Sequence, residues 1–232
     1  MSVDWLEIVP WMLHDIRAQV RKTMTSAQFL ERRLGKNADE EAMECLRSIL
    51  ASQSDLNNLS SRLALLADAE RPSSGSTAAV PLTAALLGTR LQWEEVIHQA
   101  GGELIVDRGP ACGVFEKIQV ILKELMDNAV RFADTEQPLQ VVIKAEQTDD
   151  SGVKVRVSDN GTGLDPMYID RLFRPFQRFD ARRSGFGLGL AISKAIIENA
   201  GGTIKVEPAQ RGARFVLFLP VMQPAPYDGK VA

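Results

Sequence analysis

The first third of the chain carries apolar residues at alternating steps of three and four, the spacing of one face of a helix. One series begins at Leu6, and after a break a second begins at Cys45. The first comprises Leu6, Val9, Leu13, Ile16, Val20, Thr23, Ala27, Leu30 and Leu34; the second comprises Cys45, Ile49, Ser52, Leu56, Leu59, Leu63 and Leu66. Between them, Gly35 and the polar residues after it are typical of a helix end and a turn. The pattern predicts two long helices joined as an antiparallel hairpin.

A single hairpin has apolar surface on both helices and too little partner surface to cover it. We therefore expect two copies of the chain to combine their hairpins into a four-helix bundle, which makes the protein a homodimer. The alternative is a hairpin that folds back onto the second half of its own chain.

The rest of the chain alternates between helix and strand patterns, which indicates an α+β fold with helices on one face of a mixed sheet. The expected helices are 82–99, 114–133 and 187–200, and the expected strands are 103–106, 140–145, 153–158, 203–206 and 214–219. The stretch 70–80 is rich in Ser, Pro and Gly and is typical of a linker. The predicted organisation is a hairpin over 1–69, a linker over 70–80, an α+β domain over 81–222 and a tail over 223–232.

Composition and charge exclude several classes of protein. The chain has 232 residues, of which 45% are hydrophobic and 25% charged, and this is typical of globular domains. A net charge of −3 argues against a nucleic-acid-binding protein. We expect no membrane insertion and no signal peptide, because no long apolar run or basic-then-apolar start is present. Cys45 and Cys112 lack the spacing of a disulfide framework or zinc site, which favours a cytoplasmic location.

Three clusters in the second half suit a bound polyphosphate with a metal ion. The first is the expected helix around residues 124–132, where Glu124, Asn128 and Arg131 fall on one face. An oxygen-bearing pair one turn apart suits a magnesium ion that keeps most of its waters, and a nearby arginine suits phosphate. A solvated polar face is the alternative for this cluster taken alone.

The second cluster is Asp159-Asn160-Gly161-Thr162-Gly163, directly after an apolar strand. A carboxylate at a strand end, beside backbone that glycine allows to come close, can accept a hydrogen bond from an exocyclic amine. The third cluster, Gly185-Phe186-Gly187-Leu188-Gly189, precedes an expected helix. Successive backbone N–H groups at a helix N-terminus form a phosphate cradle. Each turn alone is weak evidence for a nucleotide site, whereas the order of all three clusters is specific evidence.

In these motifs the chain resembles the catalytic core of a bacterial sensor histidine kinase, whose ATP-binding domain is of the GHKL ATPase type, an α/β sandwich. Residues 124–132 resemble the N box of that family, 159–164 its first glycine box and 185–189 its second. Residues 172–179 resemble its phenylalanine box. With the N-terminal hairpin, the resemblance covers nearly the whole chain.

The resemblance implies ATP and Mg²⁺ as ligands. Asn128 would hold the metal, with Glu124 as a possible second group that positions metal or water, and Asp159 would bind the adenine amine. Arg131 would contact phosphate. Glu124 replaces the commoner asparagine and is shared with GHKL ATPases, in which it activates water. The backbone that approaches the nucleotide would come from Gly161, Gly163, Gly185, Gly187, Leu188 and Gly189. Residues between Leu164 and Gly185 would be an ATP lid, with Phe173, Phe176 and Phe179 as its apolar anchors.

His14-Asp15 resembles the family's H box, in which a histidine followed by an acid is the phosphoacceptor. His14 follows a seam residue and so lies at the edge of the buried stripe, where its ring is reachable. Asp15 can accept a proton from one ring nitrogen and make the other more nucleophilic. A solvated surface histidine is the alternative. His98, the only other histidine, has no acid directly after it and is interpreted as structural.

Two positions depart from the family pattern. The fourth residue after His14 is Ala18, where many of these kinases have Thr or Asn tied to dephosphorylation of the partner; the fifth is Gln19, where proline is usual. Alanine cannot orient a water molecule, so we predict weak or absent phosphatase activity.

The sequence predicts an ATP-dependent kinase that phosphorylates itself on His14 and passes the phosphoryl group to an aspartate of a response-regulator receiver domain. One rival function is a GHKL ATPase or serine kinase acting on a partner, favoured by Glu124. Another is a non-enzymatic phosphotransfer or scaffold protein, disfavoured by the intact glycine clusters. A sensor upstream of the chain or on another protein would supply the signal. Whether transfer occurs within one chain or across the dimer stays open.

Overall fold

The computed structural model describes residues 5–34, 39–71, 80–107, 109, 114–115, 117–148, 152–179 and 185–220. It divides into two compact units, Met1–Arg71 and Pro72–Ala232, which are described separately below. The expected tail over 223–232, most of the expected linker and the turn at Gly35 lie outside the described residues.

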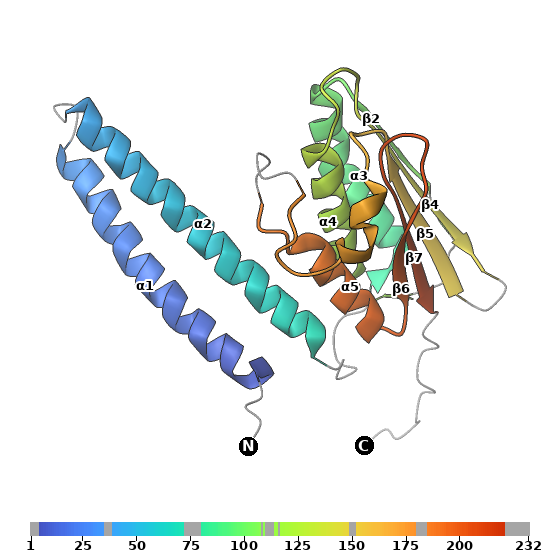
Figure 1. Ribbon diagram of the computed structural model, residues 1–232, viewed down its shortest axis with the longest axis horizontal. Coiled ribbons are helices and arrows are strands. Elements are labelled where there is room, and N and C mark those ends of the chain that lie inside the picture. Colours follow the sequence, from blue (N-terminus) through green and yellow to red (C-terminus); the bar gives the residue numbers. More distant parts are fainter. Residues whose placement is uncertain are drawn as a thin grey trace, which may run out of the picture. The chain divides into compact units, whose positions relative to one another are not determined.

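The first unit is a pair of long helices, α1 (Trp5–Leu34) and α2 (Glu40–Glu70), which pack against each other (Figure 1). The end of α1 and the start of α2 carry residues that stabilise helix termini. The Asp39 side chain accepts a hydrogen bond from the backbone N–H of Glu41 at 3.3 Å and so caps α2, while Arg32 and Arg33 lie in the last turn of α1. The predicted helical hairpin thus has the expected two helices.

The contact between α1 and α2 uses one position in every seven. On α1 the buried side chains are Leu13, Val20 and Ala27, and on α2 the series at this spacing is Leu46, Gln53, Ser60 and Ala67. The α2 series is shifted by one residue from the predicted seam of Cys45, Ser52, Leu59 and Leu66. The sequence did not predict which edge of the apolar stripe of α2 packs on α1. The apolar stripe of α2 is wide, and the helix turns its smaller and more polar edge toward α1.

Five large apolar side chains of the predicted seams are solvent-exposed within one hairpin. They are Ile16, Leu30 and Leu34 on α1 and Ile49 and Leu56 on α2, each at least 40% exposed. Each helix therefore carries a second apolar stripe that its neighbour in the hairpin does not cover.

The second unit is built on a five-stranded sheet with the order β2-β4-β5-β7-β6. Its strands are β2 (Glu103–Val106), β4 (Gln140–Gln147), β5 (Gly152–Asp159), β6 (Thr203–Glu207) and β7 (Arg214–Pro220). β2 pairs with β4 in parallel, and the other neighbours are antiparallel. The predicted mixed sheet is confirmed, and each strand lies within two residues of its expected bounds.

Three helices cover one face of this sheet: α3 (Leu82–Gln99), α4 (Ile118–Arg131) and α5 (Gly189–Asn199) (Figure 1). The core lies between the two layers, because alternate residues along each strand point to the same side. Its fully buried members include Val141, Ile143, Val153, Val155 and Leu217 from the sheet and Leu122, Leu125, Met126, Ile192 and Ile197 from the helices. The opposite face of the sheet has no helix over it among the described elements.

One expected element differs in extent. The helix predicted over 114–133 begins only at Ile118, and Val114–Phe115 is instead a short strand, β3. β3 pairs with β1 (Val80–Pro81), which lies directly before α3, in an antiparallel two-stranded ladder. The apolar pattern of these residues suits either state, and the pairing partner, distant in sequence, decides it. The short 3₁₀ helix η2 (Pro166–Arg171) also escaped prediction.

Candidate functional site

The candidate site of the second unit begins on α4, which carries three of the predicted residues on one face. Glu124 is buried, with 4% of its surface exposed, whereas Asn128 and Arg131 are half-buried. Nη1 of Arg131 lies 3.4 Å from Oδ1 of Asn128 and donates to it. The neighbouring face of α4, with Leu125 and Ala129, is buried in the core and fixes the rotation of the helix.

The turn after β5 is held by side chains as well as by backbone. Oδ1 of Asp159 accepts hydrogen bonds from the backbone N–H groups of Gly161, at 2.9 Å, and Ala213, at 3.2 Å. Asn160 fastens the turn to the segment before β4. Its Oδ1 accepts from the backbone of Gln140 at 2.7 Å, and its Nδ2 donates to the carbonyl of Pro138 at 3.0 Å.

Burial raises the pKa of the Asp159 carboxyl above its ordinary value, and the hydrogen bonds from Gly161 and Ala213 oppose that rise. The carboxyl therefore lies in a partly desolvated position, with one oxygen engaged by backbone donors. Such a group is well placed to accept a hydrogen bond from a ligand amine with its second oxygen.

The glycine segment 185–189 leads directly into α5. Gly185 and Gly187 both have positive φ angles, 118° and 68°, which side chains with a β-carbon rarely adopt. Gly189 is the first residue of α5, and Leu188 precedes it with its side chain buried. The predicted helix at 187–200 thus begins two residues late. Leu188 can offer a ligand only its backbone, since its side chain belongs to the core.

The last turn of α4 brings the three clusters together. The carbonyl of Phe132 accepts from the backbone N–H of Thr162 at 2.9 Å, and a β-carbon at Gly161 would collide with that carbonyl. On its other side, a β-carbon at Gly185 would lie 3.0 Å from Nη1 of Arg131. Segments that are far apart in sequence therefore meet around Arg131 and Phe132.

The predicted phosphoacceptor lies on α1 in the first unit. The side chain of His14 is 73% exposed and that of Asp15 is 88% exposed, with Nδ1 of the histidine 3.5 Å from Oδ1 of the aspartate. The preceding residue, Leu13, is buried against α2 and anchors this turn of the helix. Nε2, the other ring nitrogen, is the one that does not face the carboxylate.

Arg17, one turn after His14, joins the two helices at this level. Its Nε donates to Oγ of Ser60 at 3.1 Å and its Nη2 to the carbonyl of Ser60 at 3.3 Å. The apolar spacing of α1 did not point to this residue. An arginine at the edge of an apolar seam is usually solvated. The bridge to Ser60 could not be predicted without knowing that Ser60 faces Arg17 across the two helices.

Comparison with known families matches residues 113–223 to the family described as histidine kinase-, DNA gyrase B- and HSP90-like ATPase. This match covers slightly less than half of the chain. The match contains Asn128, Asp159 and the glycine segment, so the three clusters that meet around α4 belong to one domain.

Relatives extend the similarity beyond the ATPase domain. The phytochrome-like protein Cph1 of Synechocystis sp. is 28% identical over 214 residues, which are 90% of this chain and 28% of that protein. The sensor histidine kinase CusS of Escherichia coli (strain K12) is 35% identical over 134 residues, which are 55% of this chain and 27% of CusS. The chain thus spans less than a third of the length of these curated relatives.

The crystal structure of full-length ShkA in complex with AMPPNP shares the fold. It superposes with a TM-score of 0.71 at 24% identity and covers 94% of this chain and 46% of ShkA. At this identity the likeness shows a shared fold. The family match over residues 113–223 and the kinase relatives support a sensor histidine kinase catalytic core.

In the ATPase domain, the described part of the expected lid is only partly anchored by its phenylalanines. Phe179 stacks on Tyr168 with ring centroids 4.5 Å apart, and Phe173 is half-buried. Phe176 is 57% exposed and has a φ of 62°. Its backbone N–H donates to the carbonyl of Gly187 at 2.9 Å. The prediction that Phe176 is an apolar anchor is therefore wrong; its backbone, not its ring, holds the glycine segment.

Two searches over the described residues bear on the predicted ligands and partners. None of the described helices is long and apolar enough to cross a membrane. Within the same residues no group of three or more His, Cys, Asp or Glu side chains forms a metal cluster. A metal held by one carboxamide and a ligand's phosphates would need no such cluster.

Proposed function

We propose that this protein is an ATP-dependent histidine kinase of two-component signalling, which phosphorylates itself on His14 and then passes the phosphoryl group to an aspartate of a response-regulator receiver domain. The observation that carries the proposal is the meeting of three clusters at the last turn of α4. There Arg131 lies against Gly185 of the glycine segment. The carbonyl of Phe132 accepts a hydrogen bond from Thr162 in the turn that follows Asp159.

ATP would bind across this meeting point as the phosphate donor. The carboxyl of Asp159 would accept a hydrogen bond from the exocyclic amine of adenine. The close backbone around Gly161 and Gly163 would let the base approach. Backbone N–H groups from Gly185 to Gly189, at the N-terminus of α5, would hold the phosphates together with Arg131. The acceptor at Asp159 would thus match the adenine amine, and the donors of the glycine segment and Arg131 would match the phosphate oxygens.

Mg²⁺ fits the residues of α4. Asn128 is half-buried and supplies a carboxamide oxygen, and Glu124 supplies a carboxylate one turn earlier. Oxygen donors of this kind suit a magnesium ion that keeps several waters. When bound, the ion would offset the negative charge of the phosphates. Asn128 would hold it, and Glu124, being buried, would position metal or water.

His14 would act as the nucleophile through Nε2, since Nδ1 faces Asp15. Asp15 would hold the proton on Nδ1 and stabilise the positive charge that develops on the ring. In the transfer a bond forms between Nε2 and the γ-phosphorus, and the bond between that phosphorus and the β,γ-bridging oxygen breaks, which releases ADP. The exposure of both side chains leaves the ring open to an incoming nucleotide.

The exposed apolar stripe of the hairpin supports a homodimer. Ile16, Leu30, Ile49 and Leu56 belong to heptad-spaced series and are 41–52% exposed in one hairpin. A second copy presenting the same stripes would bury them in a four-helix bundle. The bundle would present His14 and the docking surface for the receiver domain.

Phosphatase activity toward the phosphorylated receiver would be weak, because Ala18 has no group that can orient water. In a test with purified phosphorylated regulator, ADP and Mg²⁺, we expect slow loss of phosphate from the unaltered protein. Ala18→Asn should accelerate that loss. Rapid Mg²⁺-dependent loss with the unaltered protein would contradict this part of the proposal.

The proposed function is tested by incubating the full chain with ATP labelled on the γ-phosphate. We expect a phosphoprotein that is labile in acid and stable in base, the behaviour of a phosphorylated imidazole. His14→Gln should abolish the label while leaving nucleotide binding intact. His98→Gln is the matched control, because His98 lies in the other unit, and it should leave labelling unchanged.

The same assay separates the rival functions. A GHKL ATPase would release free phosphate without labelling itself, and Glu124→Gln would stop that release. A serine kinase would label its partner stably in acid. A scaffold would give neither product. Any of these outcomes would overturn the kinase proposal.

A further inference from the structure

The sheet face opposite the helices is rich in basic side chains. The strand register places alternate residues of β4, β5, β6 and β7 on this face, away from the buried core. Its charged strand residues are Lys144, Lys154, Arg156, Lys205 and Arg214, against Glu103, Glu146 and Glu207. Cations thus outnumber acids here, although the chain as a whole has a net charge of −3.

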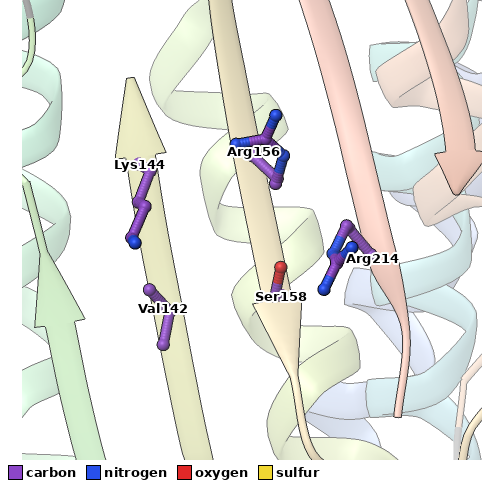
Figure 2. A pocket seen from close by; sticks show the side chains of 5 residues that line it. All are labelled: Val142, Lys144, Arg156, Ser158 and Arg214. Carbon is purple, nitrogen blue, oxygen red and sulfur yellow. The ribbon is translucent and has the colours of Figure 1, made fainter. Parts of the chain in front are cut away.

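The centre of this face is hollowed. Val142 and Lys144 of β4, Arg156 and Ser158 of β5 and Arg214 of β7 line a depression of about 350 Å³. Figure 2 shows that these side chains come from three neighbouring strands, with the Arg214 guanidinium leaning toward β5 near Ser158. A volume of this order lies at the lower end of small-molecule sites.

Two of the three cations in the hollow are not neutralised within the part of the chain that the structure describes. Arg156 lies 3.5 Å from Glu146 and 3.9 Å from Glu207. Glu207 is the register partner of Arg214 on β6, yet its carboxylate lies near Arg156 and Lys154 instead.

The guanidinium of Arg214 lacks one hydrogen-bond partner. Its Nε is buried and has no hydrogen-bond partner. Buried donors are normally paired, and leaving one unpaired is unfavourable. Lys144 forms no ion pair with any described carboxylate and is exposed beside the hollow. An acceptor-rich anion would satisfy both groups, and the Ser158 hydroxyl could donate as a third partner.

We propose that this hollow is a binding site for the phosphate group of a small phosphorylated molecule. Phosphate matches the forked donors of an arginine, and its several oxygens can engage Arg214, Lys144 and Ser158 together. The site lies on the opposite face of β5 from the candidate nucleotide site, since Ser158 and Asp159 are consecutive and point to opposite sides of the strand. It is therefore separate from the site of the phosphate donor.

The test uses the full chain, labelled with ¹⁵N and saturated with ADP and Mg²⁺ so that the nucleotide site is occupied. Inorganic phosphate, glucose 6-phosphate and acetate are titrated in parallel while backbone amide signals are followed. We expect saturable shifts at Val142, Ser158 and their neighbours with both phosphates, and binding of acetate about tenfold weaker or worse. Equal binding of the two phosphates supports recognition of the phosphate group itself. Tighter binding of glucose 6-phosphate supports recognition of a larger ligand.

Arg214→Gln and Lys144→Gln should each weaken phosphate binding about tenfold or more, because each removes a charge-assisted hydrogen bond. Lys205→Gln is the matched control. It removes the same charge from the same face but outside the hollow, and it should change binding less than twofold. Lys144 is exposed, so its variant keeps the test valid should Arg214→Gln fail to fold.

The proposal is overturned if acetate binds as well as phosphate, if Lys205→Gln weakens binding as much as the other two variants, or if no saturable shift occurs at the hollow. Binding only to an acidic protein segment would likewise overturn it. Occupancy by ADP is measured in the same samples, so a failure here leaves the proposed nucleotide site standing.

Discussion

The two units of this chain differ in how much of their apolar surface they bury. The α+β unit encloses its core between one face of the sheet and three helices, and its open sheet face is largely polar and charged. The helical hairpin buries one stripe between α1 and α2 and leaves a second stripe exposed, including Leu30, Ile49 and Leu56. The α+β unit covers its core with its own helices, whereas the hairpin leaves a stripe that the proposed second copy would cover. Under the proposed function, dimerisation uses the hairpin and nucleotide binding uses the α+β unit.

The largest expected effect comes from breaking the exposed stripe of the hairpin. Leu56→Glu should raise the dissociation constant of the dimer at least about a hundredfold, because each copy loses the burial of a leucine worth about 1.5–3 kcal/mol. Analytical ultracentrifugation over a range of concentrations measures the change.

Leu91→Glu is the control for this experiment. Leu91 lies on α3 and is 73% exposed, more than Leu56 at 48%, but it belongs to no heptad series. We expect its dimer to remain intact. Equal loss of the dimer in both variants, or a monomeric unaltered protein, would refute the distinction between the two units.

A core truncation in the α+β unit should have the next largest effect. Leu122 on α4 has no exposed surface, so Leu122→Ala should cost about 2–5 kcal/mol of unfolding free energy through lost burial and a residual cavity. Urea denaturation followed by circular dichroism measures it. Leu91→Ala, the same substitution at an exposed site of this unit, should stay within about 0.5 kcal/mol. A comparable loss at Leu91 would mean that α3 has a covered face.

The bridge between α1 and α2 should contribute less. Arg17→Ala should lower the unfolding free energy by about 1 kcal/mol, the net value of such hydrogen bonds. A double-mutant cycle with Ser60→Ala isolates the coupling between the two side chains. Arg21→Ala, at an exposed position one turn further along α1, should have no effect. Additive effects of the Arg17 and Ser60 substitutions would contradict a stabilising hydrogen bond between the Arg17 and Ser60 side chains.

The smallest effect concerns the pH dependence of stability. Because the pKa of Asp159 is raised in the folded state, the folded protein holds this proton more tightly than the unfolded chain does. The stabilising contribution of the proton is complete below the unfolded value near 3.8 and is lost as pH rises through the higher folded value. Asp159→Asn should remove this decline. Denaturation midpoints measured from pH 4 upward check it, and parallel pH profiles for both proteins would contradict it.

The sequence predicted those parts of the molecule that local periodicity determines. α3 and β2 have the expected bounds, and the other strands of the large sheet are close to theirs, because alternation of apolar residues marks a half-buried strand directly. The motif residues of the candidate site could be named in advance because three clusters, each weak evidence alone, follow one another in the order of a known family.

Features that depend on distant partners could not be predicted. Val114–Phe115 becomes a strand only because Val80–Pro81 lies beside it. The α2 residues that pack on α1 lie one position away from the predicted seam, and spacing alone does not determine which edge of an apolar stripe faces the neighbouring helix. The role of Arg17 depends on Ser60, which lies opposite it on the other helix. The contact of Arg131 with Gly185 joins two segments that are distant in sequence, and no periodic pattern predicts it.

The proposed function requires that three separate segments of residues 113–223 form one adenine-nucleotide site. Isothermal titration calorimetry of the full chain with ADP and Mg²⁺ tests it most directly, with Asp159→Ala and Lys205→Gln as the variant and its control. We expect one binding event per chain, weakened at least about tenfold by Asp159→Ala and unchanged by Lys205→Gln. Absence of binding heat in the unaltered protein at millimolar nucleotide, or full affinity in Asp159→Ala, would contradict it.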